Sequence, residues 1–360
     1  MSHRNPNPTP RRQQPSLQLG CLFSVGVLMF FAMPGQGCGQ ESEHSPDEPA
    51  SKTDRILLVV GAAGDPKFAV DFEEASFGWK DTAARNQMDL VEIKPTGELS
   101  ARSLLESAIS ESKECRSLWI VMIGHGTFAR NTAKFNLPGP DVSALELAAW
   151  LAPLKNDMYL VHCFSASAPF MKTLSGKNRI VVTSTKSGAE YNYSRFGQYL
   201  AAAINDLSND LDHDDSVSLL EAFLAANNQT QQFYEQESRL ATEHALLNDN
   251  ADALGTPGEF YTGIRPSQKA EAGKEIDGVR ASRVILMQSP SALVLSSEES
   301  KKRLDLELQL DELRRQKTRL TESQYLDRLE TLMLKLSALY VQEESSAEES
   351  TEKQVDSVGL

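Results

Sequence analysis

The sequence is poor in cysteine and in basic residues. Only four cysteines occur in 360 residues, and Cys21 and Cys38 lie near the amino terminus, so a small disulfide-rich scaffold is excluded. Cys115 lies in a polar Glu-Cys-Arg stretch whereas Cys163 ends an apolar run, and we predict no disulfide between them. The 36 basic residues are outnumbered by 50 acidic ones, and the resulting net charge of −14 argues against nucleic acid as a partner.

Long apolar runs are also scarce, and the one that is present lies at the amino terminus. The run 19–33 would make about 22 Å of helix, which is too short to cross a bilayer comfortably. Because a Pro-Gly pair follows it, we interpret residues 1–37 as a signal peptide, with a single-span anchor as the alternative. Cys38 follows a small residue, as in a bacterial lipoprotein cleavage site, so a lipid anchor at Cys38 and ordinary cleavage nearby both stay open. Either way we predict an exported chain that is periplasmic, on the cell surface or secreted.

A tether and an α/β domain follow. Residues 38–54 are rich in Glu, Ser, Pro and Asp without apolar periodicity, which predicts a disordered tether. From 55 to 264, short apolar runs alternate with stretches long enough for crossover helices, which predicts a mostly parallel sheet flanked by helices. The predicted strands are 56–60, 90–93, 118–123, 158–162 and 180–183, and the predicted helices are 100–114, 143–154, 196–207 and 219–234.

The pattern changes after residue 264. Residues 265–295 indicate a linker with one strand at 283–287, and 343–360 indicates an acidic disordered tail. Between them, over 296–342, leucines recur at helical spacing around a capping-box pair, Thr321 and Gln324. This predicts an antiparallel, coiled-coil-like helical hairpin that packs on itself or on the main domain and offers a surface for a partner helix. The expected seam is Leu306, Leu310, Leu313, Leu320, Leu326, Leu329, Met333 and Leu336.

Two residues with catalytic chemistry lie at the ends of consecutive predicted strands. His125 and Gly126 follow the third strand, and Cys163 ends the fourth. The carboxyl ends of strands line the ligand crevice of an open α/β sheet, so an imidazole and a thiol there can face one substrate. A thiolate is a good nucleophile, an imidazole can protonate a departing amine, and the Gly126 amide can bind an oxyanion. A buried structural cysteine and a turn histidine are the alternative explanation. Strand alternation turns the neighbouring His162 away from Cys163, which predicts a packing or hydrogen-bonding role for it.

The segment from 124 to 193 resembles the legumain-like cysteine peptidases, which are relatives of the caspases and gingipains. The resemblance rests on His125-Gly-Thr at one strand end and on Cys163-Phe-Ser-Ala-Ser at the next, where the family has Cys-x-Ser-Gly-Ser. Ala166 stands in place of the family's glycine. The resemblance implies a caspase-like peptidase domain over 55–264, with Cys163 as nucleophile, His125 as general acid/base and Gly126 as oxyanion donor.

The same resemblance implies a substrate and a pocket. The stretch 182–190 is similar to the strand that walls the family's specificity pocket, so Ser184 and Glu190 are the implied substrate-binding residues. The implied activity is a cysteine endopeptidase that hydrolyses peptide or protein substrates through a thioester. A transpeptidase would use the same dyad, and a non-catalytic scaffold that binds peptide or calcium is the alternative from another class.

An acidic stretch offers a second, weaker motif. Six residues have the ligand spacing of a calcium-binding EF-hand loop: Asp210, Asp212, Asp214, Ser216, Ser218 and Glu221. Asp215, however, occupies the sharp-turn position that favours glycine. Ser218 and Glu221 also have capping-box spacing, and aspartates are favourable near a helix amino terminus without any ion. We therefore predict neither a metal nor a cofactor, with calcium as the alternative.

Overall fold

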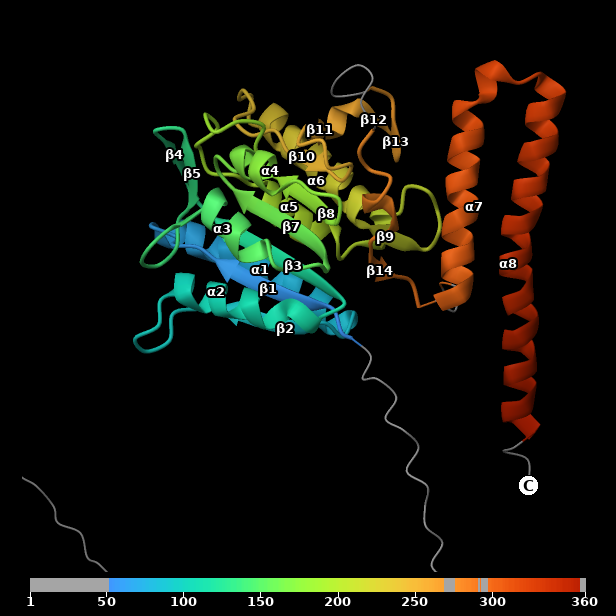
Figure 1. Ribbon diagram of the computed structural model, residues 1–360, viewed down its shortest axis with the longest axis horizontal. Coiled ribbons are helices and arrows are strands. Elements are labelled where there is room, and N and C mark those ends of the chain that lie inside the picture. Colours follow the sequence, from blue (N-terminus) through green and yellow to red (C-terminus); the bar gives the residue numbers. More distant parts are fainter. Residues whose placement is uncertain (1–51, 269–275, 291, 293–296, 357–360) are drawn as a thin grey trace, which may run out of the picture. The chain divides into compact units, whose positions relative to one another are not determined.

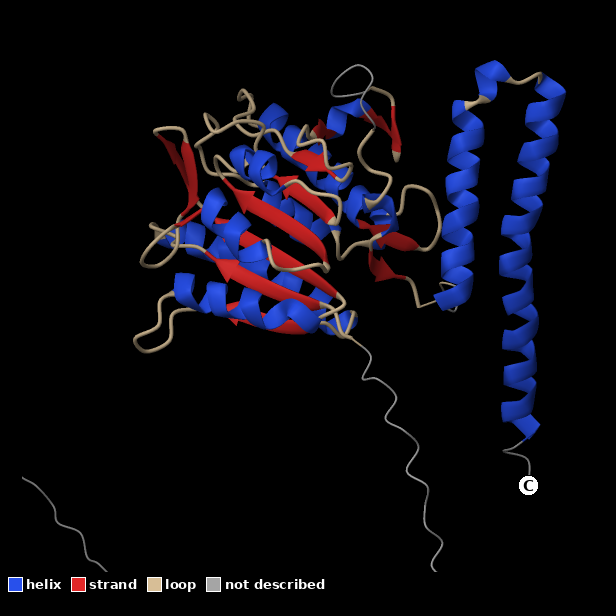
Figure 2. Cartoon of the chain, in the orientation of Figure 1, coloured by secondary structure: helices blue, strands red, loops and turns tan. Residues whose placement is uncertain are grey.

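Seven strands form the central sheet, in the order β11-β10-β8-β7-β3-β1-β2 (Figures 1 and 2). The computed structural model describes residues 52–268, 276–290, 292 and 297–356. The strands of this sheet, in chain order, are β1 (Arg55–Val60), β2 (Asp89–Ile93), β3 (Ser117–Gly124), β7 (Asp157–Phe164), β8 (Arg179–Thr183), β10 (Leu246–Asn248) and β11 (Thr256–Pro257).

Five consecutive strands, β8-β7-β3-β1-β2, run parallel, and they are the five strands predicted from the sequence. The strand β3 is buried along its whole length, which explains its unbroken apolar run. The edge strands β10 and β11 were not predicted, and β10 pairs antiparallel with β8 and with β11. They have three and two residues, too few to produce a periodic signal. The predicted α/β class with a mostly parallel sheet is therefore confirmed.

Helices cover both faces of the sheet, and each face has its own apolar core. One core contains Trp79, Cys163, Leu200 and Phe223, and the other contains Leu105, Leu147 and Phe170. The first face carries α1 (Pro66–Arg85), α5 (Phe196–Ala203) and α6 (Leu219–Gln236). The second carries α2 (Ala101–Glu111), α3 (Ala144–Leu151) and α4 (Ala168–Leu174).

The four predicted helices correspond to α2, α3, α5 and α6, and their ends follow local capping chemistry. Ser143 and Ser218 begin α3 and α6 with complete capping boxes. The helix α1 was not predicted, although the sequence contains signals for it. Asp65 caps it, a proline follows at its first position, and its buried Phe72, Ala75, Trp79 and Ala83 recur at helical spacing.

A small three-stranded sheet follows β3 directly. It consists of β4 (Gly126–Ala129), β5 (Thr132–Phe135) and β6 (Val142–Ser143), and the β4–β5 hairpin turns through Arg130 and Asn131. Both turn residues have positive φ, 49° and 65°, as a two-residue hairpin turn of the primed type requires. The strand β4 begins directly after His125, and its pairing with β5 fixes the direction in which the chain leaves the main sheet.

The described residues of the predicted linker belong largely to the α/β domain. The predicted strand 283–287 is β14 (Ile285–Gln288), which pairs antiparallel with β9 (Ser216–Ser218). A further short ladder joins β12 (Tyr261–Thr262) to β13 (Arg265–Pro266). The carboxylate of Asp249 accepts hydrogen bonds from the amides of Gly278, Arg280 and Ala281. The boundary predicted at 264/265 therefore divides one packed unit, because the contacts that join its halves come from residues with no sequence periodicity.

The predicted helical hairpin consists of α7 (Ser297–Arg315) and α8 (Glu322–Asp356), with the Thr321–Gln324 capping contacts between them. Its seam on α8 differs from the prediction. Leu326 and Met333 are half exposed, and the contacting residues on α8 are Tyr325, Leu329, Leu332, Leu336 and Leu339. This set alternates spacings of four and three, which keeps one stripe of an α-helix facing its partner. The predicted pattern 326-329-333-336 shares Leu329 and Leu336 with that stripe, and its Leu326 and Met333 lie one position away from it.

The carboxyl-terminal part of the chain differs from the prediction, whereas the amino-terminal predictions lie outside the described residues. α8 continues to Asp356, where we expected a disordered tail from 343. Residues 343–356 include no proline or glycine and are rich in glutamate, a good helix former. The predicted signal peptide, most of the tether and Cys38 lie outside the described residues. Within the described part, no helix combines the length and apolar character needed to cross a bilayer.

His162 is the most unusual buried group of the sheet. It is fully buried on the face opposite to Cys163, against the rings of Phe164 and Phe170, and neither of its nitrogens has a hydrogen-bond partner. Burial lowers the pKa of His162 to about 3. Of the two roles predicted for His162, the structure therefore supports packing and not hydrogen bonding.

Replacing His162 with leucine should make the fold less sensitive to acid. Below pH 6.5 the unfolded chain takes up a proton at His162 that the native state does not bind, so wild-type stability falls as pH falls toward 3. Between pH 7 and pH 5 the wild type should lose about 2 kcal/mol more than His162→Leu, as measured by urea unfolding at both pH values. Equal losses in the two proteins would show that His162 is not a buried neutral group.

Candidate functional site

The two predicted catalytic residues come from neighbouring strands and share one face of the sheet. Cys163 of β7 lies beside Ile123 of β3 in the parallel register, and His125 follows two residues later. Side chains two positions apart in an extended chain point to the same face, so His125 is directed to the face of Ile123 and Cys163. The structure thus brings the imidazole and the thiol to the same layer, between the sheet and the helices α1 and α5.

His125 is half-buried among aromatic rings. Its ring packs edge-on against Phe68 and Phe72 of α1, at centroid distances of 4.8 and 5.2 Å, and lies 6.0 Å from the ring of Tyr193. Its Nε2 lies 3.2 Å from the carbonyl oxygen of Ala63. Because a carbonyl can only accept, Nε2 carries the proton and Nδ1 is the free acceptor of the neutral ring. Burial lowers the pKa of His125, and the bond to Ala63 opposes this shift.

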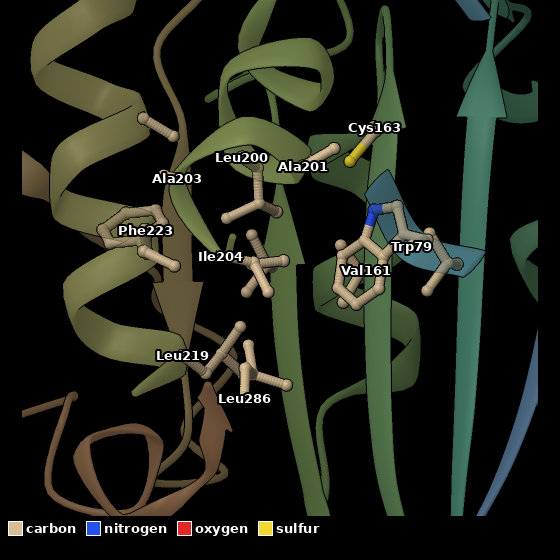
Figure 3. Close-up of a cluster of buried hydrophobic side chains, with 14 of the residues drawn as sticks. Trp79, Val161, Cys163, Leu200, Ala201, Ala203, Ile204, Leu219, Phe223 and Leu286 are labelled. Atoms are coloured by element: carbon tan, nitrogen blue, oxygen red, sulfur yellow. The ribbon is translucent and has the colours of Figure 1, made fainter. Parts of the chain in front are cut away.

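Cys163 is enclosed in the apolar core. Only 3% of the residue is exposed, and Figure 3 shows it in one cluster with Trp79, Leu200 and Ala201. The second residue of α5, Gly197, lies directly over it. A Cβ added at Gly197 would be 2.4 Å from the Cβ and 3.1 Å from the Sγ of Cys163. Burial raises the pKa of the Cys163 thiol far above its usual value, and the Glu243 carboxylate adds to the rise. In this conformation the sulfur is a neutral, covered thiol.

The predicted oxyanion donor is already hydrogen-bonded within the chain. The amide of Gly126 donates to the Oγ of Ser165 at 3.1 Å. A side chain at position 126 would meet the carbonyl oxygen of Ser165 at 2.1 Å, so only glycine fits. Ala166 has φ of 58°, a left-handed conformation that favours glycine. Glycine is the residue at this position in the legumain-like peptidases that the segment resembles. An oxyanion at Gly126 would have to displace the Ser165 hydroxyl.

The two predicted substrate-binding residues are engaged in contacts inside the protein. Ser184 is fully buried and donates to the carbonyl oxygen of His162. Glu190 pairs with His244, Oε1 to Nδ1 at 2.6 Å, and its other oxygen accepts from the amide of Lys186. These contacts hold the loop that follows β8 and leave neither side chain free in this conformation.

A cavity of about 410 Å³ lies beside the His125 ring. Phe68 and Tyr193 contact His125 and also line this cavity, whereas Cys163 does not line it. Sequence reasoning missed the cavity, because its residues come from separate segments that carry no motif. We call it the basic cavity, and it is lined by Lys67, Phe68, Asp71, Asn192, Tyr193, Arg195, Tyr234, Arg239 and Thr242.

Glu243 holds the start of α5 over Cys163. This carboxylate is 3% exposed and accepts hydrogen bonds from the amides of Arg195 and Phe196 and from the hydroxyls of Ser194 and Tyr234. Burial raises the pKa of Glu243 while the four donors oppose that rise. Four donors around one buried carboxylate fix the first turn of α5, and with it the position of Gly197. A lone glutamate after α6 gives no sequence signal for this role.

The acidic loop brings three carboxylates together. Asp210, Asp212 and Asp214 place ligand oxygens within 4.8 Å of one another, and burial together with the neighbouring carboxylates raises the pKa of Asp212 to about 6. Asp215 has φ of 63° at the expected sharp-turn position. Glu221, however, forms the capping box with Ser218. The acidic side chains of this loop thus fit helix capping without an ion as well as they fit calcium binding.

Comparison with known proteins gives structural neighbours only. No family model matches the sequence, and no curated protein matches it. The structure is similar to the Drosophila initiator caspase Dronc, at 13% identity over 49% of this chain and 73% of that chain, with a TM-score of 0.36. It is also similar to caspase-1 from Spodoptera frugiperda, at 8% identity over 55% of this chain and 86% of that chain, with a TM-score of 0.34. Similarity at this level establishes no activity.

Proposed function

We propose that this protein is an exported cysteine endopeptidase that uses Cys163 and His125, in a resting conformation that shields the nucleophile. The observation that carries the proposal is the position of the two residues, on one face of the sheet at the carboxyl ends of adjacent parallel strands. This is the edge at which open α/β sheets bind ligands. The resemblance of the 124–193 segment to legumain-like peptidases supports the same assignment, and the lipid anchor at Cys38 remains part of the export hypothesis.

The proposed reaction needs α5 to move first. A displaced Gly197 would let water reach the Cys163 sulfur, and removing the burial lowers the pKa of the thiol toward its usual value. His125 takes the thiol proton at Nδ1, and the thiolate attacks the scissile carbonyl carbon to form a thioester. His125 then gives that proton to the nitrogen of the departing amine as the peptide C–N bond breaks. Water hydrolyses the thioester and restores the thiol. With an amine in place of water the same residues would carry out transpeptidation.

A non-catalytic scaffold is the second candidate, and the burial of Cys163 favours it. A sulfur that stays under Gly197 would act as a small apolar core group. Incubation with a panel of fluorogenic peptides, varied at the residue before the scissile bond, separates the two functions. A peptidase cleaves at least one member of the panel. Binding of peptides without cleavage of any member would favour the scaffold.

A further inference from the structure

The basic cavity carries positive charge in an acidic protein. Lys67, Arg195 and Arg239 contribute three cations to its wall and Asp71 contributes one carboxylate, whereas the whole chain has a net charge of −14. None of the three cations forms an ion pair with a carboxylate in the described part of the chain. With three cations and one carboxylate in its wall, the cavity has an excess of positive charge, which creates a local field that attracts an anion.

The key cation is held in place before any ligand arrives. The Arg195 guanidinium lies over the ring of Phe233 at 4.2 Å and over that of Tyr193 at 5.2 Å, and its backbone amide donates to Glu243. A guanidinium fixed by two rings loses little freedom when it binds an anion, and its planar fork matches a carboxylate in two parallel hydrogen bonds. Lys67 is similarly held over Phe68, at 4.6 Å from the ring centroid.

The remaining walls fit an organic anion better than a small dianion. Phe68 and Tyr193 supply flat apolar surfaces, and Asn192 and Thr242 supply neutral hydrogen-bonding groups. Asp71 forms a side-chain hydrogen bond with Tyr193 and would repel a second negative charge. A volume of about 410 Å³ accommodates one side chain with part of its backbone.

We propose that the basic cavity binds a carboxylate group of a peptide, with Arg195 and Arg239 as its principal partners. The group is either an acidic side chain or a free carboxyl terminus, since both present the same planar anion. The inference goes beyond the proposed catalysis, because the site does not include Cys163 and would serve a peptidase or a scaffold equally. A bound peptide would lie beside the His125 ring, which shares Phe68 and Tyr193 with the cavity.

Fluorescence anisotropy with the full chain carrying Cys163→Ala tests this binding without turnover. Three labelled hexapeptides are compared: one with an internal glutamate and an amidated carboxyl terminus, one with glutamine in its place, and the glutamine peptide with a free carboxyl terminus. We expect one or both carboxylate peptides to bind at least tenfold more tightly than the neutral peptide. The carboxylate peptide that binds more tightly shows whether the cavity prefers an acidic side chain or a free carboxyl terminus. Equal affinity for all three overturns the proposal. A fourth hexapeptide, with an internal phosphoserine and an amidated carboxyl terminus, is also measured, and tighter binding of this peptide than of both carboxylate peptides overturns the proposal as well.

Variants locate the binding site. Arg195→Gln and Arg239→Gln should each weaken the preferred peptide about tenfold, whereas Asp71→Asn should tighten it, because it removes the one negative charge and keeps a hydrogen-bond acceptor. Lys113→Gln makes the same charge change as the arginine variants at an exposed position before β3 and serves as the control. Thermal melts verify that each variant is folded. Unchanged affinity in folded Arg195→Gln and Arg239→Gln, or weaker binding by Asp71→Asn, would place the carboxylate elsewhere.

Discussion

Replacing Cys163 with alanine should abolish peptide hydrolysis, with a loss on the order of 10⁴-fold or more in kcat/KM. The reason is that Cys163 is the thiol on the face of His125 at the ends of β3 and β7, whereas Cys115, the other free cysteine of the described residues, lies before the start of β3. His125→Ala should lose about 10² to 10⁴-fold, because the departing amine then lacks its proton donor. The measurement is the rate of release of the fluorophore from the best member of the peptide panel.

Cys115→Ala is the matched control for this experiment. Cys115 is the other free cysteine of the described residues and lies partly exposed beside Asn156, before the amino-terminal end of β3. Its removal should leave the hydrolysis rate unchanged within a factor of about two. Full activity in Cys163→Ala would exclude the Cys163 thiol as the nucleophile.

Gly197→Ala should both destabilise the fold and uncover Cys163. The new methyl group would lie 2.4 Å from the Cβ of Cys163, and α5 must shift to accept it. Overpacking of this kind costs about 1–3 kcal/mol in the free energy of unfolding, measured by urea denaturation. The displaced helix should raise the rate at which iodoacetamide modifies Cys163 by about tenfold or more, because a local opening eased by 1.4 kcal/mol is tenfold more populated.

Gly176→Ala provides the control for the glycine substitution. A Cβ at Gly176 would approach only the flexible side chain of Arg179, at 3.4 Å, so stability and labelling should change little. If Gly197→Ala has the stability and the labelling rate of the wild type, α5 does not cover the sulfur in solution.

The sheet could be predicted because its strands are continuous apolar runs with crossover lengths between them. His125 and Cys163 were predicted at the ends of consecutive strands, and the strand order of the structure makes these two strands neighbours in the sheet. The seam of α8 was predicted only in part, because Leu329 and Leu336 belong both to the predicted stripe and to the stripe that packs against α7. Only packing against α7 selects Leu332 over Met333.

The surroundings of the site could not be predicted from the sequence. Gly197 covers Cys163 from 34 positions further along the chain, and Glu243 fixes Gly197 from a still later segment. The basic cavity combines residues of α1, of the loop before α5, of α6 and of the chain after α6. Glycine, glutamate and arginine in isolation have no spacing that indicates such contacts, so these relations depend on tertiary structure alone.

The most direct test of the account compares two electrophiles on the wild-type protein. A peptide that carries a thiol-reactive group in place of its scissile bond is incubated with the protein, iodoacetamide is used in parallel, and mass spectrometry identifies the modified cysteine. We expect the peptide electrophile to modify Cys163, because substrate binding and opening of α5 occur together, and we expect iodoacetamide to modify Cys115 and largely spare Cys163. Failure of every peptide electrophile to modify Cys163, with Cys115 modified normally, would contradict the assignment of Cys163 as a catalytic nucleophile.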